Sequence, residues 1–185
     1  KTKPCITIGV DGIAQGYSVD VVANFLEQQH ITDYVVEIGG EISVKGRKKP
    51  GNEKMKIGIE APGNYEFESP VIQKIIVIDE GAVTTSGNYR KYHESNGEKF
   101  SHTIDPRTGY PTKNELISVT VFARDAITAD AYDKVLMTLG LKKALIFTEQ
   151  RKDIAAYFIY KTPNGTIADT ASSRFYGLFG GRRSE

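Results

Sequence analysis

Short apolar runs separated by glycine, proline and asparagine turns dominate this chain, and they predict more strands than helices. One run, 115–123, is rich in β-branched residues, which favour strands. The Asn96-Gly97 pair predicts a hairpin turn within residues 89–105. The expected strands are 34–38, 41–46, a strand from Met55 that ends before Pro62, 71–79, 81–87, 115–123, 153–161 and 166–171.

Three segments have the spacing of helices instead. In residues 15–30 the apolar side chains of Val19, Val22, Phe25 and Leu26 recur every three to four positions. Segments 126–139 and 142–150 are the other two expected helices. Because the strands mostly follow one another directly, the pattern predicts an α+β fold, a mainly antiparallel sheet with a few packed helices.

The charge of the chain is nearly balanced. Among 185 residues, 24 are lysine or arginine and 23 are aspartate or glutamate. This balance argues against nucleic acid or an anionic membrane surface as the main partner. A single cysteine excludes an intrachain disulfide, and no apolar run is long enough to cross a bilayer.

The segment ADAYDK places two carboxylates on one face of an expected helix. Asp130 and Asp133 stand at positions i and i+3, and Lys134 follows the second. Two like charges at that spacing repel each other unless a proton, a cation or a basic side chain lies between them. The segment is therefore either a solvated helix face with an internal ion pair or a cation site.

Two turn-rich segments could present polar groups to a ligand. In SHTIDPRTGYP, residues 101–111, the turn residues could direct backbone amides and His102 toward an anion. In TTSGNYR, residues 84–90, a strand runs into Ser86-Gly87 and could offer backbone donors. The alternative interpretation of each segment is an ordinary turn or bend.

Seven segments, read in order, resemble the ApbE family of FAD:protein FMN transferases. They are GIAQGYSVD, EIGGEISVKG, IGIEAP, VTTSGNYR, SHTIDPRTGYP, SVTVFA and ADAYDKVLMTLG, and the resemblance extends from about residue 7 to residue 160. It implies one ApbE-like (T-fold-like) domain over residues 1–185. Members of the family carry a further segment that also helps to hold FAD, so we expect this chain to be a carboxy-terminal portion without that amino-terminal segment.

The resemblance also implies a site. By it, Asp130 and His102 are the catalytic residues, and Asp130 and Asp133, with the backbone oxygen of Gly12, are ligands of Mg²⁺. Two positions depart from the family pattern: Gly9 stands where an aspartate is usual, with Asp11 nearby, and Lys134 replaces a threonine that is another metal ligand. The residues implied to bind the flavin nucleotide are Gln15, Gly16, Ser86, Gly87, His102 and Ile104.

The implied activity is Mg²⁺-dependent transfer of FMN from FAD to a threonine or serine hydroxyl of an acceptor protein, with release of AMP. The alternatives are hydrolysis of FAD to FMN and AMP, and a non-catalytic flavin-binding domain. The resemblance further implies an acceptor flavoprotein subunit of a redox-driven pump and a location on the periplasmic side of the cytoplasmic membrane. Members of the family are often lipoproteins, held to that membrane by an amino-terminal anchor that is absent from these residues.

Overall fold

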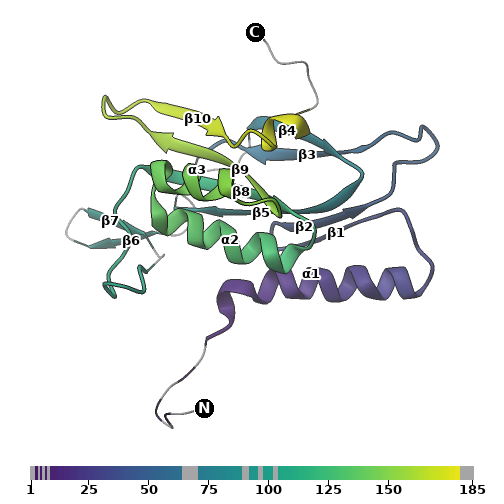
Figure 1. Ribbon diagram of the computed structural model, residues 1–185, viewed down its shortest axis with the longest axis horizontal. Helices are drawn as coiled ribbons and strands as arrows, with labels where there is room; N and C mark the ends of the chain where they lie inside the picture. Colours follow the sequence, from purple (N-terminus) through teal and green to yellow (C-terminus); the bar gives the residue numbers. More distant parts are fainter. Residues whose placement is uncertain are drawn as a thin grey trace.

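A six-stranded antiparallel sheet is the centre of the fold (Figure 1). The computed structural model describes residues 3, 5, 7, 9–63, 71–88, 92–95, 98–101 and 104–179. Every pair of neighbouring strands in this sheet is antiparallel, which confirms the predicted α+β class. The strands, in their order across the sheet, are β1 (Tyr34–Ile38), β2 (Glu41–Lys45), β5 (Glu80–Gly87), β8 (Leu116–Ala123), β9 (Ile154–Lys161) and β10 (Ile167–Ala171).

Three helices cover one face of the sheet: α1 (Asp11–Gln28), α2 (Ala126–Leu139) and α3 (Leu141–Gln150). The side chain of Asp125 caps α2 by accepting a hydrogen bond from the backbone N–H of Thr128 at 2.9 Å. Gly140, with φ of +74°, separates α2 from α3, because this backbone conformation is strained for residues with a Cβ atom. The chain can therefore turn sharply and lay both helices on the same face.

The opposite face of the sheet packs against a hairpin and a short 3₁₀ turn. The hairpin consists of β3 (Met55–Glu60) and β4 (Ile72–Ile78), and the turn is η1 (Phe175–Leu178). Alternation along β9 divides the core between the faces: Tyr157 packs toward the hairpin and Phe158 toward α2 and α3. A second small hairpin, β6 (Tyr92–Ser95) and β7 (Glu98–Ser101), lies apart from the main sheet.

The predicted elements agree with the structure to within one residue at each end, except for α1. The expected hairpin forms as β6 and β7, whereas its turn, Asn96-Gly97, lies outside the described residues. The turn η1 was not predicted from the sequence.

The helix predicted over residues 15–30 spans Asp11–Gln28 instead, and its apolar residues are only partly on the buried face. Val22 and Phe25 are exposed, at 39% and 58%, whereas Val19 and Ala23 are buried. The buried face is the one that carries small residues, because α1 lies very close to α2 and large side chains do not fit between the two helices.

Candidate active site

The site begins where α1 crosses α2. Gly16 is buried at this crossing, and a Cβ atom added to it would lie 2.4 Å from the carbonyl oxygen of Ala126. The absence of a side chain lets the backbone N–H of Gly16 donate a hydrogen bond to Asp130 Oδ2 at 2.9 Å. One turn further along α1, the carboxylate of Asp20 accepts bonds from the first backbone N–H groups of α2, those of Ala126 and Ile127, both at 2.8 Å. These contacts fix α1 against the start of α2.

The two aspartates of α2 point into the protein rather than into solvent. Asp130 is 1% exposed and Asp133 is fully buried. Strand β5 supplies donors to the second carboxylate: Thr84 Oγ1 donates to Asp133 Oδ2 and Ser86 Oγ donates to Asp133 Oδ1, each at 2.8 Å. Thr84 and Ser86 reach the same carboxylate because alternate residues of a strand point to the same face of the sheet.

Lys134 supplies the positive charge between these carboxylates. Its ammonium forms an ion pair with Asp130 Oδ1 and lies 3.2 Å from Asp133 Oδ1. The same ammonium donates to the backbone oxygen of Asp130 at 3.3 Å. The lysine side chain stays 36% exposed, although its ammonium contacts oxygens of buried carboxylates. The structure therefore contains the internal ion pair that the sequence suggested. The two aspartates of this pair are buried, however, and do not lie on a solvated helix face.

A third carboxyl belongs to this arrangement and was missed in the sequence. Glu41, at the start of β2, is only 6% exposed. Burial, followed by the charges of Asp130 and Asp133, raises the pKa of Glu41 to about 7. Nothing in the sequence marked it, because a glutamate that follows a Gly-Gly turn normally lies in solvent. We call Glu41, Asp130, Asp133 and Lys134 the acidic cluster.

Burial also dominates the titration of Asp133. It raises the pKa of this carboxyl to about 6, although Lys134, Ser86 and Thr84 each act in the opposite direction. For Lys134, burial lowers the pKa of the ammonium, but the carboxylates of Asp133 and Asp130 outweigh it and raise the pKa above its usual value. The lysine is therefore fully charged at neutral pH.

The structure brings several of the predicted site residues together. Gly12 lies beside Lys134, since an added Cβ would be 3.5 Å from Lys134 Cδ. The amide of Gln15 lies against Gly39, where an added Cβ would be 2.2 Å from its Nε2 atom. Gly16, Asp130, Asp133 and Ser86 are linked directly by the hydrogen bonds described above, and Gly87 follows Ser86 at the end of β5.

Other predicted residues are not joined to the cluster by a described contact. Ile104 is 49% exposed and forms an isolated backbone bridge with Pro111. Its segment closes on itself, with the N–H of Asp105 donating to the carbonyl of Tyr110 at 2.9 Å. His102 lies outside the described residues. The roles of Ile104 and His102 in flavin binding or catalysis stay predictions.

The arrangement of the acidic cluster does not suit a divalent cation. All four carboxylate oxygens of Asp130 and Asp133 already accept hydrogen bonds or ion pairs from the protein. Across the described part of the chain, no group of three or more histidine, cysteine, aspartate or glutamate side chains is arranged to hold a metal. The predicted Mg²⁺ ligands are thus brought together, but a lysine ammonium lies between them.

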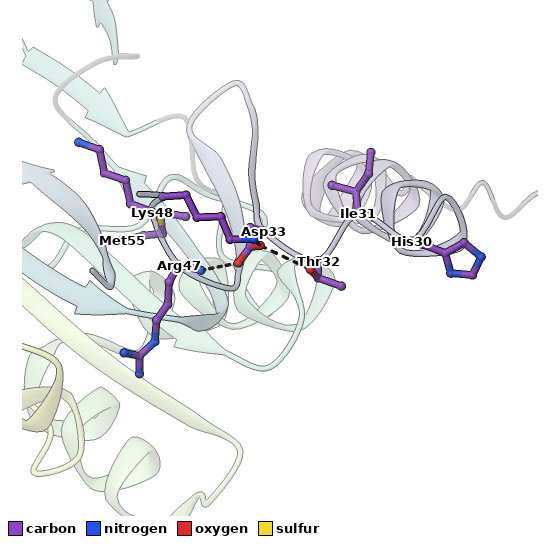
Figure 2. A pocket seen from close by; sticks show the side chains of 8 residues that line it. His30, Ile31, Thr32, Asp33, Arg47, Lys48 and Met55 are labelled. Atoms are coloured by element: carbon purple, nitrogen blue, oxygen red, sulfur yellow. Dashed lines mark hydrogen bonds and ion pairs between the residues drawn. The ribbon is translucent and has the colours of Figure 1, made fainter. Parts of the chain in front are cut away.

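A second charged region lies at the other end of α1, in an open depression of about 500 Å³ (Figure 2). We call it the basic hollow, and Figure 2 shows Asp33 directed toward the segment that begins at Arg47. The backbone N–H of Arg47 donates to Asp33 Oδ1 at 2.9 Å, and Lys49 pairs with Asp33 Oδ2 at 2.6 Å. Its lining residues are His30, Ile31, Thr32, Asp33, Arg47, Lys48, Lys49 and Met55.

Comparison with known proteins identifies relatives over nearly the whole chain. A family profile described as the ApbE family matches residues 1–158. The chain is 39% identical over 173 residues to a protein of Haemophilus influenzae named FAD:protein FMN transferase, a match that covers 94% of this chain and 49% of the relative. A protein of the same name from Vibrio cholerae is 39% identical over 175 residues, covering 95% and 51%. The chain thus spans about half the length of these curated relatives.

Solved structures give the same result. The flavin transferase ApbE from Vibrio cholerae superposes with a TM-score of 0.81 at 36% identity, covering 97% of this chain and 55% of that one. The apo form of the Pseudomonas stutzeri flavinyl transferase ApbE gives a TM-score of 0.80 at 38% identity, covering 95% and 52%. The likeness therefore includes the helices and strands that form the acidic cluster.

Proposed function

This chain belongs to the ApbE family, and on that basis we propose that it forms part of an enzyme that transfers FMN from FAD to a protein. The acceptor group is the hydroxyl of a threonine or serine, and the second product is AMP. The proposal is supported by relatives named FAD:protein FMN transferase, which are 39% identical to nearly all of this chain. Because the chain spans about half of those proteins, the complete activity is a proposal.

In the proposed reaction the acceptor hydroxyl oxygen attacks the phosphorus of the FMN half of FAD. A phosphoester bond forms, the bond from that phosphorus to the bridging oxygen breaks, and AMP leaves with the bridging oxygen. The hydroxyl proton passes to a base, for which His102 is the candidate. Negative charge develops on the leaving AMP, so a positive group near the pyrophosphate lowers the barrier.

One structural observation carries the proposal. Three segments that the family resemblance assigns to a single flavin site are in contact here: Gly16 donates to Asp130, and Ser86 donates to Asp133. In the acidic cluster the positive group available to a phosphate is the ammonium of Lys134, whose side chain is 36% exposed. We leave divalent metal out of the transfer step, because the carboxylate oxygens that would bind it already have partners.

The proposal includes a flavoprotein subunit of a redox-driven pump as the acceptor, and the periplasmic side of the cytoplasmic membrane as the place of action. Both rest on the family resemblance alone. No helix among the described residues is long and apolar enough to span a membrane. The net charge of +1 agrees with the absence of nucleic acid from the proposed partners.

The test is incubation of the purified protein with FAD and a candidate acceptor subunit. Chromatography quantifies AMP and free FMN, and intact mass spectrometry measures flavin on the acceptor. We expect AMP to form in equal amount to covalently bound FMN, and an acceptor whose hydroxyl residue is replaced by alanine to stay unmodified.

The alternatives give different results in the same experiment. Equal amounts of AMP and free FMN with an unmodified acceptor would identify an FAD pyrophosphatase. Retention of FAD without AMP would identify a flavin-binding domain. Either result would overturn the proposed transfer.

A further inference from the structure

The acidic cluster contains its own cation. Asp130 and Asp133 are almost completely removed from water, so each carboxylate needs a counter-charge or a proton to be stable there. The ammonium of Lys134 contacts both carboxylates. Asp130 and Lys134 stand at positions i and i+4 on α2, with the acid on the amino-terminal side, which is the favourable orientation. Helix geometry therefore directs the lysine to this place without any other partner.

The remaining carboxylate oxygens are occupied by donors from two other elements. Asp130 Oδ2 accepts from the N–H of Gly16 in α1. Asp133 Oδ2 accepts from Thr84, and Asp133 Oδ1 accepts from Ser86 as well as from Lys134. A metal ion would need at least one of these oxygens, and each is already within hydrogen-bond distance of a protein donor. Among the described residues, no buried side-chain nitrogen or oxygen lacks a partner.

The position of the lysine stem makes this arrangement stable. A Cβ atom added at Gly12 would lie 3.5 Å from Lys134 Cδ, so the stem passes beside the first turn of α1. Since the ammonium is attached to the same helix as both aspartates, its local concentration at the cluster is high without any binding from solution. Mg²⁺ loses its water reluctantly and demands near-octahedral geometry, so it competes poorly for these oxygens.

We propose that the ammonium of Lys134 is the resident cation of the acidic cluster and that it excludes divalent metal from Asp130 and Asp133. If the flavin-transfer function holds, on which this second step rests, the phosphates of the nucleotide meet this ammonium rather than a metal ion. Lys134 is then a residue that positions and neutralises phosphate. Gly16, Thr84 and Ser86 hold the carboxylates that keep the ammonium in place, and Gly12 lies beside the lysine stem.

The first test measures divalent-metal binding without any flavin, so its result does not depend on the proposed reaction. Mn²⁺ is titrated into the protein and followed by calorimetry and by electron paramagnetic resonance. We expect no saturable binding by the unchanged protein at millimolar Mn²⁺. In Lys134→Thr a repelling charge leaves and a hydroxyl oxygen arrives, so we expect saturable binding that is tighter by about tenfold or more.

The matched control is Lys45→Thr. Lys45 has the same side-chain exposure, 36%, and pairs with a carboxylate at 2.8 Å, but that carboxylate, Glu27, is 41% exposed. This variant should bind Mn²⁺ no better than the unchanged protein. Equal Mn²⁺ affinity of the Lys134→Thr variant and the unchanged protein, whether both bind or neither does, would overturn the proposal.

A second measurement needs no variant, in case Lys134→Thr does not fold. The melting temperature of the unchanged protein is recorded with Mg²⁺, with Mn²⁺ and with a chelator. We expect the same value in all three conditions, because a ligand stabilises only a protein that binds it. A saturable rise in melting temperature with either metal would show that Lys134 gives way to the ion, and would overturn the proposal.

Discussion

The two ends of α1 hold similar charged groups in opposite environments. Near Gly16 the carboxylates of the acidic cluster are buried, and burial raises the pKa of Asp133 to about 6. Near the carboxyl end of the helix, the carboxylates of Asp33 and Asp79 are more exposed, at 27% and 35%. There hydrogen bonds from Lys49 and Lys54 lower the pKa values of Asp33 and Asp79.

The comparison shows that the burial of the acid decides how much an ion pair contributes to stability. Lys134 and Lys45 are equally exposed, at 36%, but the carboxylates that they contact are 0–1% and 41% exposed, respectively. Surface pairs contribute little because water solvates both partners when they separate. Water cannot solvate a buried carboxylate in this way, so the carboxylate needs the lysine beside it as a counter-charge.

The largest expected effect is that of Lys134→Met, which keeps the length of the side chain and removes its charge. We expect a loss of about 3–4 kcal/mol in the free energy of unfolding at pH 7, because two buried carboxylates lose their counter-charge. Lys45→Met should cost less than about 1 kcal/mol. Urea unfolding of both variants measures the difference. Equal losses would mean that Lys134 is an ordinary surface lysine.

Gly16→Ala should have the next largest effect. The new methyl group would lie 2.4 Å from the carbonyl oxygen of Ala126 and 2.7 Å from Asp130 Cβ, so α1 and α2 must separate. We expect a loss of about 2–3 kcal/mol, measured by the same unfolding experiment. Gly12→Ala is the control, since its methyl group would make only an ordinary contact at 3.5 Å and alanine favours helix. A Gly16→Ala protein as stable as Gly12→Ala would contradict the close crossing.

Glu41→Gln should remove a pH dependence of stability. The pKa of Glu41 is about 7 in the folded protein against an ordinary value of 4.5, so ionisation of Glu41 destabilises the fold as pH rises through this window. The variant, which cannot ionise, should therefore gain stability over the unchanged protein between about pH 4.5 and pH 8, by an amount of the order of 2 kcal/mol.

The control for that pH dependence is Asp79→Asn, at the other end of α1. The pKa of Asp79 is lowered, so its contribution is present at neutral pH and is lost as pH falls below its ordinary value of 3.8. Asp79→Asn should be less stable than the unchanged protein at pH 7, with a difference that disappears at low pH. For both variants, the difference in unfolding free energy from the unchanged protein is measured from pH 3 to pH 8. If the two differences changed with pH in the same direction relative to zero, the two ends of α1 would not differ as described.

Ser86→Ala should have the smallest effect of this series. It removes one donor from Asp133 Oδ1, which keeps Lys134 as a partner, so we expect a loss of about 1.5 kcal/mol. Thr85→Ala, on the same strand, removes only a hydroxyl that pairs with Thr120 at 2.9 Å, and should cost less. Thermal unfolding measures both losses. If Thr85→Ala lost more stability than Ser86→Ala, the hydrogen bonds donated to Asp133 would not be the stronger contribution of this strand.

The fold could be predicted from the sequence where local signals agreed. Segment 126–139 forms α2 with the predicted bounds, because apolar spacing, a cap at Asp125 and a glycine stop at Gly140 all indicate the same helix. The start of α1 was missed because the glycine-rich segment that contains Gly9 and Gly12 suggests a loop. The apolar spacing does not show which side chains of α1 are buried, since Val22 and Phe25 are exposed whereas Val19 is buried.

Three residues of the acidic cluster were marked in the sequence, but their electrostatics were not. Asp130 and Asp133 were identified from their spacing and from the family resemblance, and Lys134 was recognised as a departure. Their burial, the donors from Thr84 and Ser86, and the nearby carboxyl of Glu41 come from segments distant in sequence. No local pattern encodes those contacts, so the sequence alone left open a solvated face with an internal ion pair and a cation site.

The most direct test of the central claim is a crystal structure of the protein soaked in Mn²⁺, with an anomalous difference map calculated at the manganese edge. We expect no manganese peak between Asp130 and Asp133, with the ammonium of Lys134 in contact with both carboxylates. A manganese peak between those carboxylates, with the side chain of Lys134 turned into solvent, would contradict it.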